Sequence, residues 1–185
     1  SLLMATGARW RELRAEGIDR FRDAGVSPAA LASDSDRARD KDVIVIGGGI
    51  AAGQAAVSLS RKGRSVRVIV RGKALKSTMS RYLVDRVERS PRIEVMTETE
   101  VVALHGSAVV ESVTLQSADG AREDIDTSAV YVMIGADPCT EVSDGMLATD
   151  DAGFLLCGDG AHGCEGHMVW PLHDREPALL ETVRP

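Results

Sequence analysis

Aromatic side chains are scarce in this 185-residue chain, where phenylalanine, tryptophan and tyrosine together make up 3% of the residues. Few rings are therefore present on which the bases of single-stranded nucleic acid stack. Positive charge is also in deficit, because 22 lysines and arginines face 28 aspartates and glutamates and leave a net charge of -6. An acidic protein binds a phosphate backbone poorly, so we expect no nucleic-acid partner.

Long apolar runs and cysteines are scarce as well. No run approaches the ~20 residues that a membrane-spanning helix needs, and no signal-peptide pattern opens the sequence. We therefore expect no membrane partner. Three cysteines make an odd number without a dense disulfide framework, which favours a reducing, cytoplasmic location.

Alternating apolar patterns predict a parallel sheet in the middle of the chain. Continuous apolar runs indicate strands buried on both faces, and each is followed by a helical pattern. In chain order we expect a strand over 43–46, a helix over 50–61, a strand over 66–70, a helix from Thr78 to about Arg89 and a strand over 93–96. Ser77 is the expected cap of the second helix, whose buried stripe is Met79, Leu83 and Val87. Such alternation is typical of a right-handed parallel sheet.

The pattern changes after residue 97. Short apolar runs at 101–104, at 113–115 and around Ile125 are separated by turn residues, which predicts an antiparallel meander. A buried, parallel-type strand returns over 129–134. The predicted fold is therefore α/β, a Rossmann-like three-layer ββα sandwich with a central parallel sheet and an antiparallel β-meander.

A glycine-rich turn directly follows the first strand and opens a helix. Gly47-x-Gly49-x-x-Ala52 has the spacing of a dinucleotide fingerprint, in which glycines allow a tight turn and the close approach of a pyrophosphate. Gly48 lies inside the turn, and the backbone amides of Gly49, Ile50 and Ala51 are the expected donors to the phosphates. Two alternatives stay open: a glycine turn that only packs the βαβ unit, and a nucleoside site of a methyltransferase.

The end of the second strand distinguishes the cofactors. An NAD site usually places an acid there to hold the ribose 2′-hydroxyl, but no acid occurs between Arg64 and Arg81. Arg71, Lys73 and Lys76 supply positive charge instead. We expect NADPH rather than NADH, with Arg71 and Lys76 on the 2′-phosphate; an ordinary solvated basic loop is the alternative.

Several motifs follow one another in a recognisable order. They are Ala5-Thr6-Gly7-Ala8, the runs 43–56, 68–72 and 77–83, Ile134-Gly135-Ala136-Asp137-Pro138-Cys139-Thr140, Trp170-Pro171-Leu172 and Leu180-Glu181-Thr182. Together they resemble the NADPH-binding domain of thioredoxin reductase-like flavoproteins, which are class II pyridine nucleotide–disulfide oxidoreductases. The family's His-Arg-Arg-x-x-x-Arg phosphate pattern is reduced here to Arg71 and Lys76.

The resemblance implies a part of an NADPH- and FAD-dependent oxidoreductase. It divides the chain into a connector from a missing FAD domain (1–41), an NADPH-binding domain (42–157) and a return segment toward the FAD domain (158–185). Ile134 and Gly135 would line the nicotinamide end, and hydride would pass from NADPH to FAD without a catalytic acid or base. The implied partners are the FAD domain of the same parent chain and a thioredoxin-like or other electron acceptor, and a homodimer of the parent is compatible with the family.

The sequence lacks one motif of the family, the redox-active cysteine pair. Residues 25–32, where small thioredoxin reductases carry Cys-x-x-Cys, contain no cysteine, so direct dithiol exchange through that pair is excluded for this chain. A non-catalytic dinucleotide-binding or redox-sensing module therefore remains the alternative function.

The cysteines and histidines near the end of the chain are not predicted to form a metal site. Cys157, Cys164, His162 and His167 lie close together in sequence, but their spacing matches no familiar zinc scheme, so we expect no metal. Cys139 is expected to be a buried structural thiol, and Gly158-Asp159-Gly160 to be unrelated to the family's flavin-contacting Gly-Asp. The apolar runs at both ends are expected to be strands whose partners lie in a larger protein.

Overall fold

The structure is a computed structural model that describes residues 3–28, 30, 34, 38–75, 79–143, 145–162 and 178–182. The chain divides into two compact units, Glu12–Ile134 and the pair of segments Ser1–Arg11 and Gly135–Pro185. Each is described by itself. Lys76, Ser77 and the 170–172 motif lie outside the described residues.

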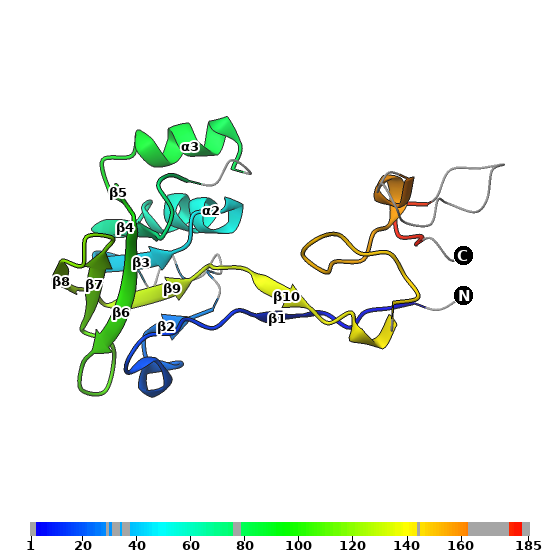
Figure 1. Ribbon diagram of the computed structural model, residues 1–185. Coiled ribbons are helices and arrows are strands. Elements are labelled where there is room, and N and C mark those ends of the chain that lie inside the picture. Colours follow the sequence, from blue (N-terminus) through cyan, green and yellow to red (C-terminus); the bar gives the residue numbers. More distant parts are fainter. Residues whose placement is uncertain are drawn as a thin grey trace. The chain divides into compact units, whose positions relative to one another are not determined.

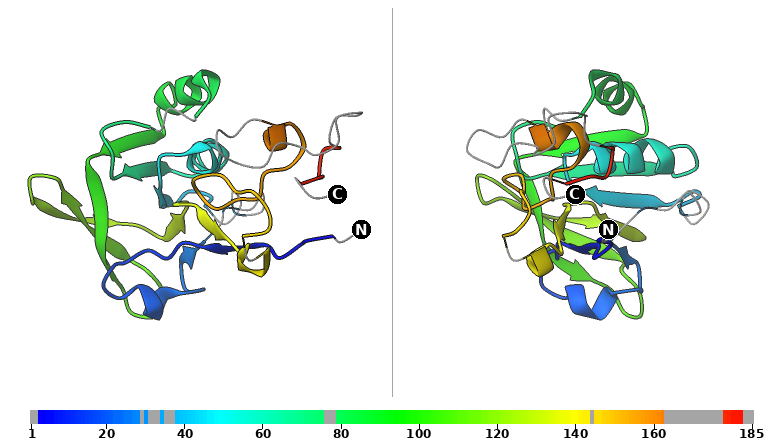
Figure 2. Two further views of the ribbon diagram at one scale, coloured as in Figure 1. Left: turned by 45° about the vertical axis from the view of Figure 1, so that its right-hand side comes forward. Right: turned by 90° about the vertical axis from the view of Figure 1, so that its right-hand side faces the viewer.

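A parallel sheet of five strands forms the centre of the larger unit, in the order β2-β9-β3-β4-β5. Its strands are β2 (Val26–Ser27), β3 (Asp42–Ile46), β4 (Ser65–Val70), β5 (Ile93–Thr97) and β9 (Ala129–Val132). Helices α2 (Ile50–Leu59) and α3 (Arg81–Glu88) lie on the same side of these strands (Figures 1 and 2). An antiparallel sheet follows β5 and consists of β6 (Thr99–His105), β7 (Ser112–Ser117) and β8 (Arg122–Asp126).

Alternate residues of β3 show why the unit has three layers. Val43 and Val45 are buried in a cluster with the small residues of α2. Ile44 and Ile46 belong to a second cluster with the apolar residues of the meander. Side chains of a strand alternate between the two faces of its sheet, so the sheet is covered by helices on one face and by the meander on the other. The predicted ββα sandwich is confirmed.

The second helix begins later than predicted. Ser80, not Ser77, is its N-cap, and the Ser80 hydroxyl accepts a 3.4 Å hydrogen bond from the Leu83 amide. Both serines are suitable caps in sequence, and only the structure selects between them. Met79, Leu83 and Val87 are all buried as predicted, but Met79 precedes the helix, so the buried stripe of α3 consists of Leu83 and Val87.

The charge-dense stretch before β3 is not solvated throughout. Phe21, in the short 3-10 helix Ile18–Phe21, is only 1% exposed and belongs to the core cluster on the meander side. β2 pairs in parallel with β9. Glu16 exchanges two backbone hydrogen bonds with β6, its amide donating to Val102 and its carbonyl accepting from Leu104. This part of the predicted connector therefore belongs to the larger unit.

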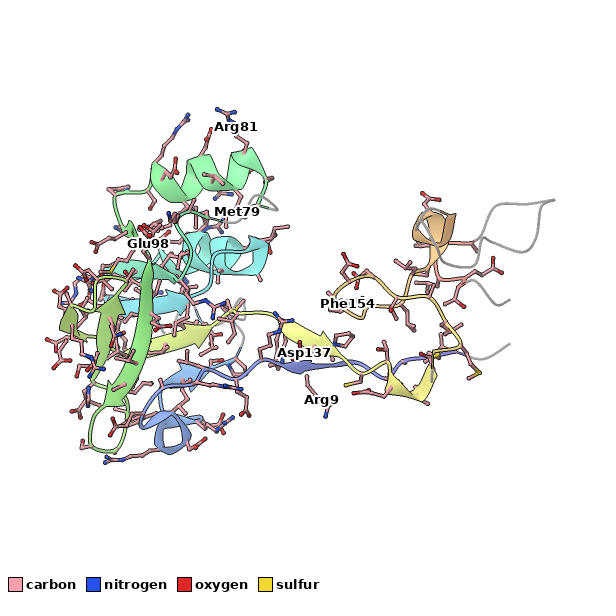
Figure 3. The ribbon with its side chains drawn as sticks, in the orientation of Figure 1. Arg9, Met79, Arg81, Glu98, Asp137 and Phe154 are labelled. Atoms are coloured by element: carbon pink, nitrogen blue, oxygen red, sulfur yellow. The ribbon has the colours of Figure 1, made fainter. Side chains whose placement is uncertain are left out.

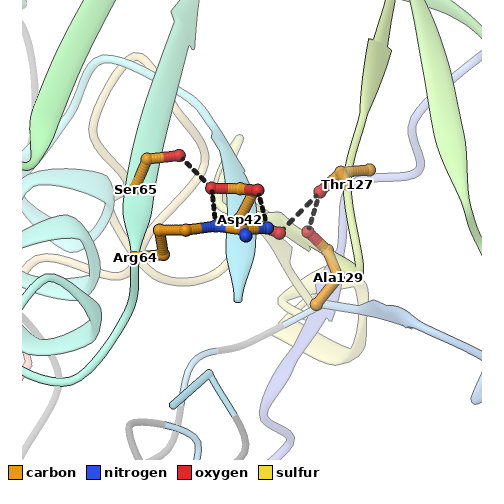
Figure 4. Close-up of polar contacts among 5 residues, drawn as sticks. All are labelled: Asp42, Arg64, Ser65, Thr127 and Ala129. Carbon is orange, nitrogen blue, oxygen red and sulfur yellow. Dashed lines mark hydrogen bonds and ion pairs between the residues drawn. The ribbon is translucent and has the colours of Figure 1, made fainter. Parts of the chain in front are cut away.

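A polar network joins the amino ends of three strands (Figure 4). The Asp42 carboxylate accepts hydrogen bonds from the Arg64 guanidinium and, at 2.7 Å, from the Ser65 hydroxyl. The Asp42 carbonyl accepts one from the Thr127 hydroxyl at 3.2 Å. The Arg64 hydrogen bond lowers the pKa of Asp42, and the Ser65 bond acts in the same direction. The network lies at the opposite strand ends from the glycine turn, so we interpret it as structural.

The smaller unit contains a two-stranded antiparallel ribbon, in which β1 (Ala8–Trp10) pairs with β10 (Ala136–Pro138). Cross-strand ion pairs accompany it, and one joins Arg11 to Asp137 at 2.8 Å. The Cys139 amide donates to the Gly7 carbonyl at 3.0 Å, so two of the recognised motifs are hydrogen-bonded neighbours. Residues 178–182, predicted to begin a strand, form a turn instead, because the Glu181 carboxylate accepts from the Ala178 amide at 2.7 Å.

In the described part of the chain, no helix has the length and apolar character required to cross a membrane.

Candidate dinucleotide-binding site

Gly47 makes the turn at the carboxyl end of β3, and its position requires glycine. Its φ is +134°, a conformation that is essentially restricted to glycine. A Cβ here would lie 2.3 Å from the Met133 carbonyl oxygen, at the end of β9. The Gly47 amide donates to the Ile69 carbonyl of β4 at 2.9 Å. The turn is thus held against the strands on both sides of β3.

Gly49 is the N-cap of α2, and unlike Gly47 its backbone conformation does not require glycine. Its φ of -93° and ψ of -177° are extended, and any residue adopts them. No side chain caps α2, and its first turn contains no acidic residue. The first amides of a helix have no acceptor within it, so those of Ile50 and Ala51 are available to an anion. Ala52, the third fingerprint residue, is fully buried, which requires a small side chain.

The strand order places this turn where ligands bind in open α/β sheets. β3 lies between β9 and β4, and the chain continues from β4 to β5 on one side while β9 returns on the other. Ligands of doubly wound sheets bind outside the carboxyl ends of the strands at such a switch point. The structure therefore combines a glycine turn, an uncapped helix and a switch point in one place, with buried Gly48 inside the turn.

The loop after β4 carries the predicted positive charge, but the fold adds an acid to it. Arg71 and Lys73 are exposed, and Arg71 makes no ion pair within the described residues. The Glu98 amide, at the corner between β5 and β6, donates to the Gly72 carbonyl at 3.0 Å (Figure 3 labels Glu98). Glu98 has a φ of +51°. Glu98 is far from this loop in sequence and comes next to it only in the folded sheet, where β5 lies beside β4.

The two residues predicted for the nicotinamide end fall in different units. Ile134, the last residue of the larger unit, is half-buried against the cluster on the meander side of the sheet. Gly135 begins the ribbon of the smaller unit with a φ of +99°, and its carbonyl accepts from the Arg11 amide at 3.0 Å. Their role at the nicotinamide remains a prediction.

The cysteines of the described ranges are not part of a metal-binding cluster. Cys139 and Cys157 are free thiols that are partly exposed, so the predicted burial of Cys139 is only partial. Cys164 and His167 lie outside the described residues. Among the residues that are described, no three histidines, cysteines or carboxylates are arranged to hold a metal ion. Gly158 donates its amide to the Glu181 carbonyl at 2.9 Å.

Comparison with known proteins gives a consistent result. The sequence model of the pyridine nucleotide-disulphide oxidoreductase family matches residues 1–161. A thioredoxin reductase of Mycolicibacterium smegmatis is 32% identical over 156 residues, which are 84% of this chain and 49% of that protein. A second, from Streptomyces clavuligerus, is 31% identical over 84% of this chain and 48% of its own length.

Solved structures agree. Thioredoxin reductase from Giardia duodenalis superposes with a TM-score of 0.73 at 30% identity, over 84% of this chain and 50% of that one. The Streptococcus pyogenes enzyme gives 0.70 at 26% identity, over 83% of this chain and 50% of its own. The chain thus spans about half the length of the relatives it matches.

Proposed function

Because the chain belongs to the pyridine nucleotide-disulphide oxidoreductase family, we propose that it is the NADPH-binding part of a thioredoxin reductase-like, FAD-dependent oxidoreductase. The observation that carries this proposal is the uncapped N-terminus of α2, directly behind Gly47 at the switch point of the sheet. The half-length match to the relatives supports a partner domain within the parent chain, the FAD domain. The division into a connector (1–41), a cofactor domain (42–157) and a return segment (158–185) stays part of the proposal, while the structure groups residues 12–134 in one unit.

The residues of the turn bind and orient the cofactor. The amides of Gly49, Ile50 and Ala51 hold the pyrophosphate, with Gly48 in the turn behind them, and the missing side chain of Gly49 leaves space for it. Arg71 and Lys76 contact the 2′-phosphate, while Ile134 and Gly135 line the nicotinamide end. Bound NADPH supplies the hydride that reduces FAD, and no side chain of this chain has to move a proton.

The electron acceptor must be reached without the family's usual dithiol in this chain. Residues 25–32 contain no cysteine, and Val26 and Ser27 of this segment are paired with β9 instead. Reduced flavin therefore passes its electrons to a thioredoxin-like or other acceptor by a route that does not use this position.

Titration with the two coenzymes tests the site. NADPH should bind the chain more tightly than NADH, and Arg71→Ala should weaken NADPH by roughly 5- to 30-fold. That range corresponds to about 1–2 kcal/mol for a charge-assisted contact of an exposed arginine. Binding of NADH should change by less than about 2-fold. Arg14→Ala removes another exposed arginine and is the matched control. Binding of neither coenzyme would contradict the dinucleotide site, and a preference for NADH would contradict only the role of Arg71 and Lys76.

Anaerobic reduction tests the oxidoreductase activity. The chain is extended by the FAD-domain sequences of its parent and mixed with NADPH, and the flavin absorbance is followed. Bleaching of the flavin is the expected result. A flavin that stays oxidised in a protein that binds NADPH would favour the redox-sensing alternative.

A further inference from the structure

A second candidate site lies at the other end of α2 from the glycine turn. An open groove of about 360 Å³ runs between the last residues of α2 and helix α3. Arg61, Tyr82, Asp85, Arg86 and Arg89 are among its lining residues, and we call it the arginine groove. Tyr82, Asp85 and Arg86 of α3 and its C-cap Arg89 follow one another at helical i, i+3, i+4 and i+7 spacings, so they share one face of that helix.

Positive charge dominates the arginine groove although the protein is acidic. Three guanidinium groups face one carboxylate, in a chain whose net charge is -6. The carboxylate, Asp85, lies 3.5 Å from Arg89, and the side chains of this pair are 44% and 82% exposed, so their attraction is weak. Arg61 and Arg86 are exposed and make no ion pair within the described residues. Two guanidinium groups are therefore ready to bind carboxylates from another molecule.

Tyr82 adds an apolar surface beside these charges. It is 71% exposed, and the Arg86 guanidinium carbon lies 5.6 Å from the centre of its ring. A cation–π contact of this kind holds the arginine over the ring and reduces its freedom. Exposed tyrosine and arginine together are typical of the residues that dominate the energy of protein interfaces.

A further arginine lies beside the groove. The Ser60 and Arg61 carbonyls, at the C-terminal end of α2, accept hydrogen bonds from Arg92 at 3.2 and 3.3 Å, so the negative end of the helix is already matched by a guanidinium group. The guanidinium groups of Arg61 and Arg86 come from the end of α2 and from α3, and carboxylates spaced along an extended peptide can pair with both.

We infer that the arginine groove docks an acidic polypeptide segment of a partner protein. Carboxylates of the segment pair with Arg61 and Arg86, and an apolar side chain packs on Tyr82. The groove and the glycine turn are at opposite ends of α2, so the segment and a dinucleotide bind without competing. The inference stands on the groove alone and does not depend on the proposed function.

Fluorescence anisotropy tests this with a fluorescein-labelled peptide of eight glutamates around one phenylalanine, added to the full 185-residue chain. The peptide should bind, and binding should weaken with added salt. An exposed ion pair contributes roughly 2- to 5-fold, so R61A/R86A should weaken binding by roughly 4- to 25-fold. R14A/R122A, which removes the same charge from exposed positions elsewhere, should change it by less than about 2-fold.

Several results would overturn the inference. These are equal losses in R61A/R86A and R14A/R122A, comparable binding of a lysine analogue of the peptide, displacement of the peptide by equimolar inorganic phosphate, and displacement by NADPH. R61K/R86K keeps the charge but loses the planar guanidinium that lies over Tyr82, so it should weaken binding less than R61A/R86A does, which separates a lost contact from a misfolded variant. Absence of any binding at low salt contradicts the inference as well.

Discussion

The two glycines of the turn after β3 should respond to substitution in opposite ways. Gly47→Ala places a methyl group where the Met133 carbonyl oxygen is only 2.3 Å and its carbon 2.9 Å away. It also forces alanine into a backbone conformation with φ of +134°. Gly49→Ser puts a larger side chain on a residue whose extended backbone accepts it. The first variant should lose stability, whereas the second should lose only cofactor binding.

The magnitude for Gly47→Ala follows from these two effects. A non-glycine residue in a sparsely populated conformation costs about 1–3 kcal/mol. Moving the Met133 carbonyl to a normal contact distance costs about another 1–3 kcal/mol, as other overpacking substitutions do. The free energy of unfolding should therefore fall by about 2–6 kcal/mol, which is a large part of the 5–15 kcal/mol typical of a domain.

Gly49→Ser should leave the free energy of unfolding unchanged or raise it by a few tenths of a kcal/mol, because serine is the better N-cap. Its side chain occupies the space proposed for the pyrophosphate, so the dissociation constant for NADPH should rise by about 10-fold or more. Urea unfolding followed by far-ultraviolet circular dichroism measures the first quantity, and calorimetric titration measures the second.

A Gly47→Ala variant whose free energy of unfolding lies within about 0.5 kcal/mol of that of the unsubstituted chain, the usual range of neutral surface substitutions, would contradict the steric conflict at Gly47. A Gly49→Ser variant that binds NADPH as tightly as the unsubstituted chain would contradict the role proposed for Gly49. A loss of stability in both variants would show that the N-cap is constrained by the fold and that its glycine says nothing about a ligand.

Three further changes test other parts of the larger unit. Asp42→Asn should reduce the free energy of unfolding at pH 7 by about 1 kcal/mol. Arg64 lowers the pKa of Asp42 in the folded state, so this difference between variant and unsubstituted chain is present above the ordinary pKa of aspartate, near 4. In acid unfolding curves the difference should disappear as the pH falls through the folded-state pKa of Asp42. Gly53→Leu should cost about 1–3 kcal/mol, because even a Cβ there is 2.8 Å from the Met79 side chain, whereas Gly53→Ala should stay within about 1 kcal/mol because that side chain is flexible; thermal melts compare them. Glu98→Gln should raise the ratio of NADPH to NADH affinity in a coenzyme titration, and an unchanged ratio would place the Glu98 carboxylate away from the 2′-phosphate.

The layers of the larger unit could be predicted because their patterns are local. Continuous β-branched runs identify buried strands wherever they occur, and the alternation of β3 side chains between two clusters explains why such a run is apolar at every position. The glycine turn was predictable for the same reason, since strand, turn and helix are consecutive in the chain.

Elements held by distant partners could not be predicted in this way. β2 is two residues long in a charge-dense stretch, and its register against Val130 and Tyr131 is set by residues about a hundred positions away. Phe21 carries no periodic signal that distinguishes a core residue from an exposed one. Ser77 and Ser80 are equivalent caps in sequence, and the choice depends on how α3 packs against Gly53 of α2.

Around Gly72, the loop sequence alone and the folded structure lead to different expectations about which coenzyme binds. Along the chain, Arg71 and Lys73 stand in a loop without an acid, which favours a phosphorylated coenzyme. Through the sheet, Glu98 is fixed to the same loop by the hydrogen bond from its amide to Gly72. A carboxylate that reached the cofactor from this corner would oppose a 2′-phosphate and suit a ribose hydroxyl. The proposed preference for NADPH is therefore a difference between two opposing effects, and the Arg71 and Glu98 variants should move the ratio of NADPH to NADH affinity in opposite directions.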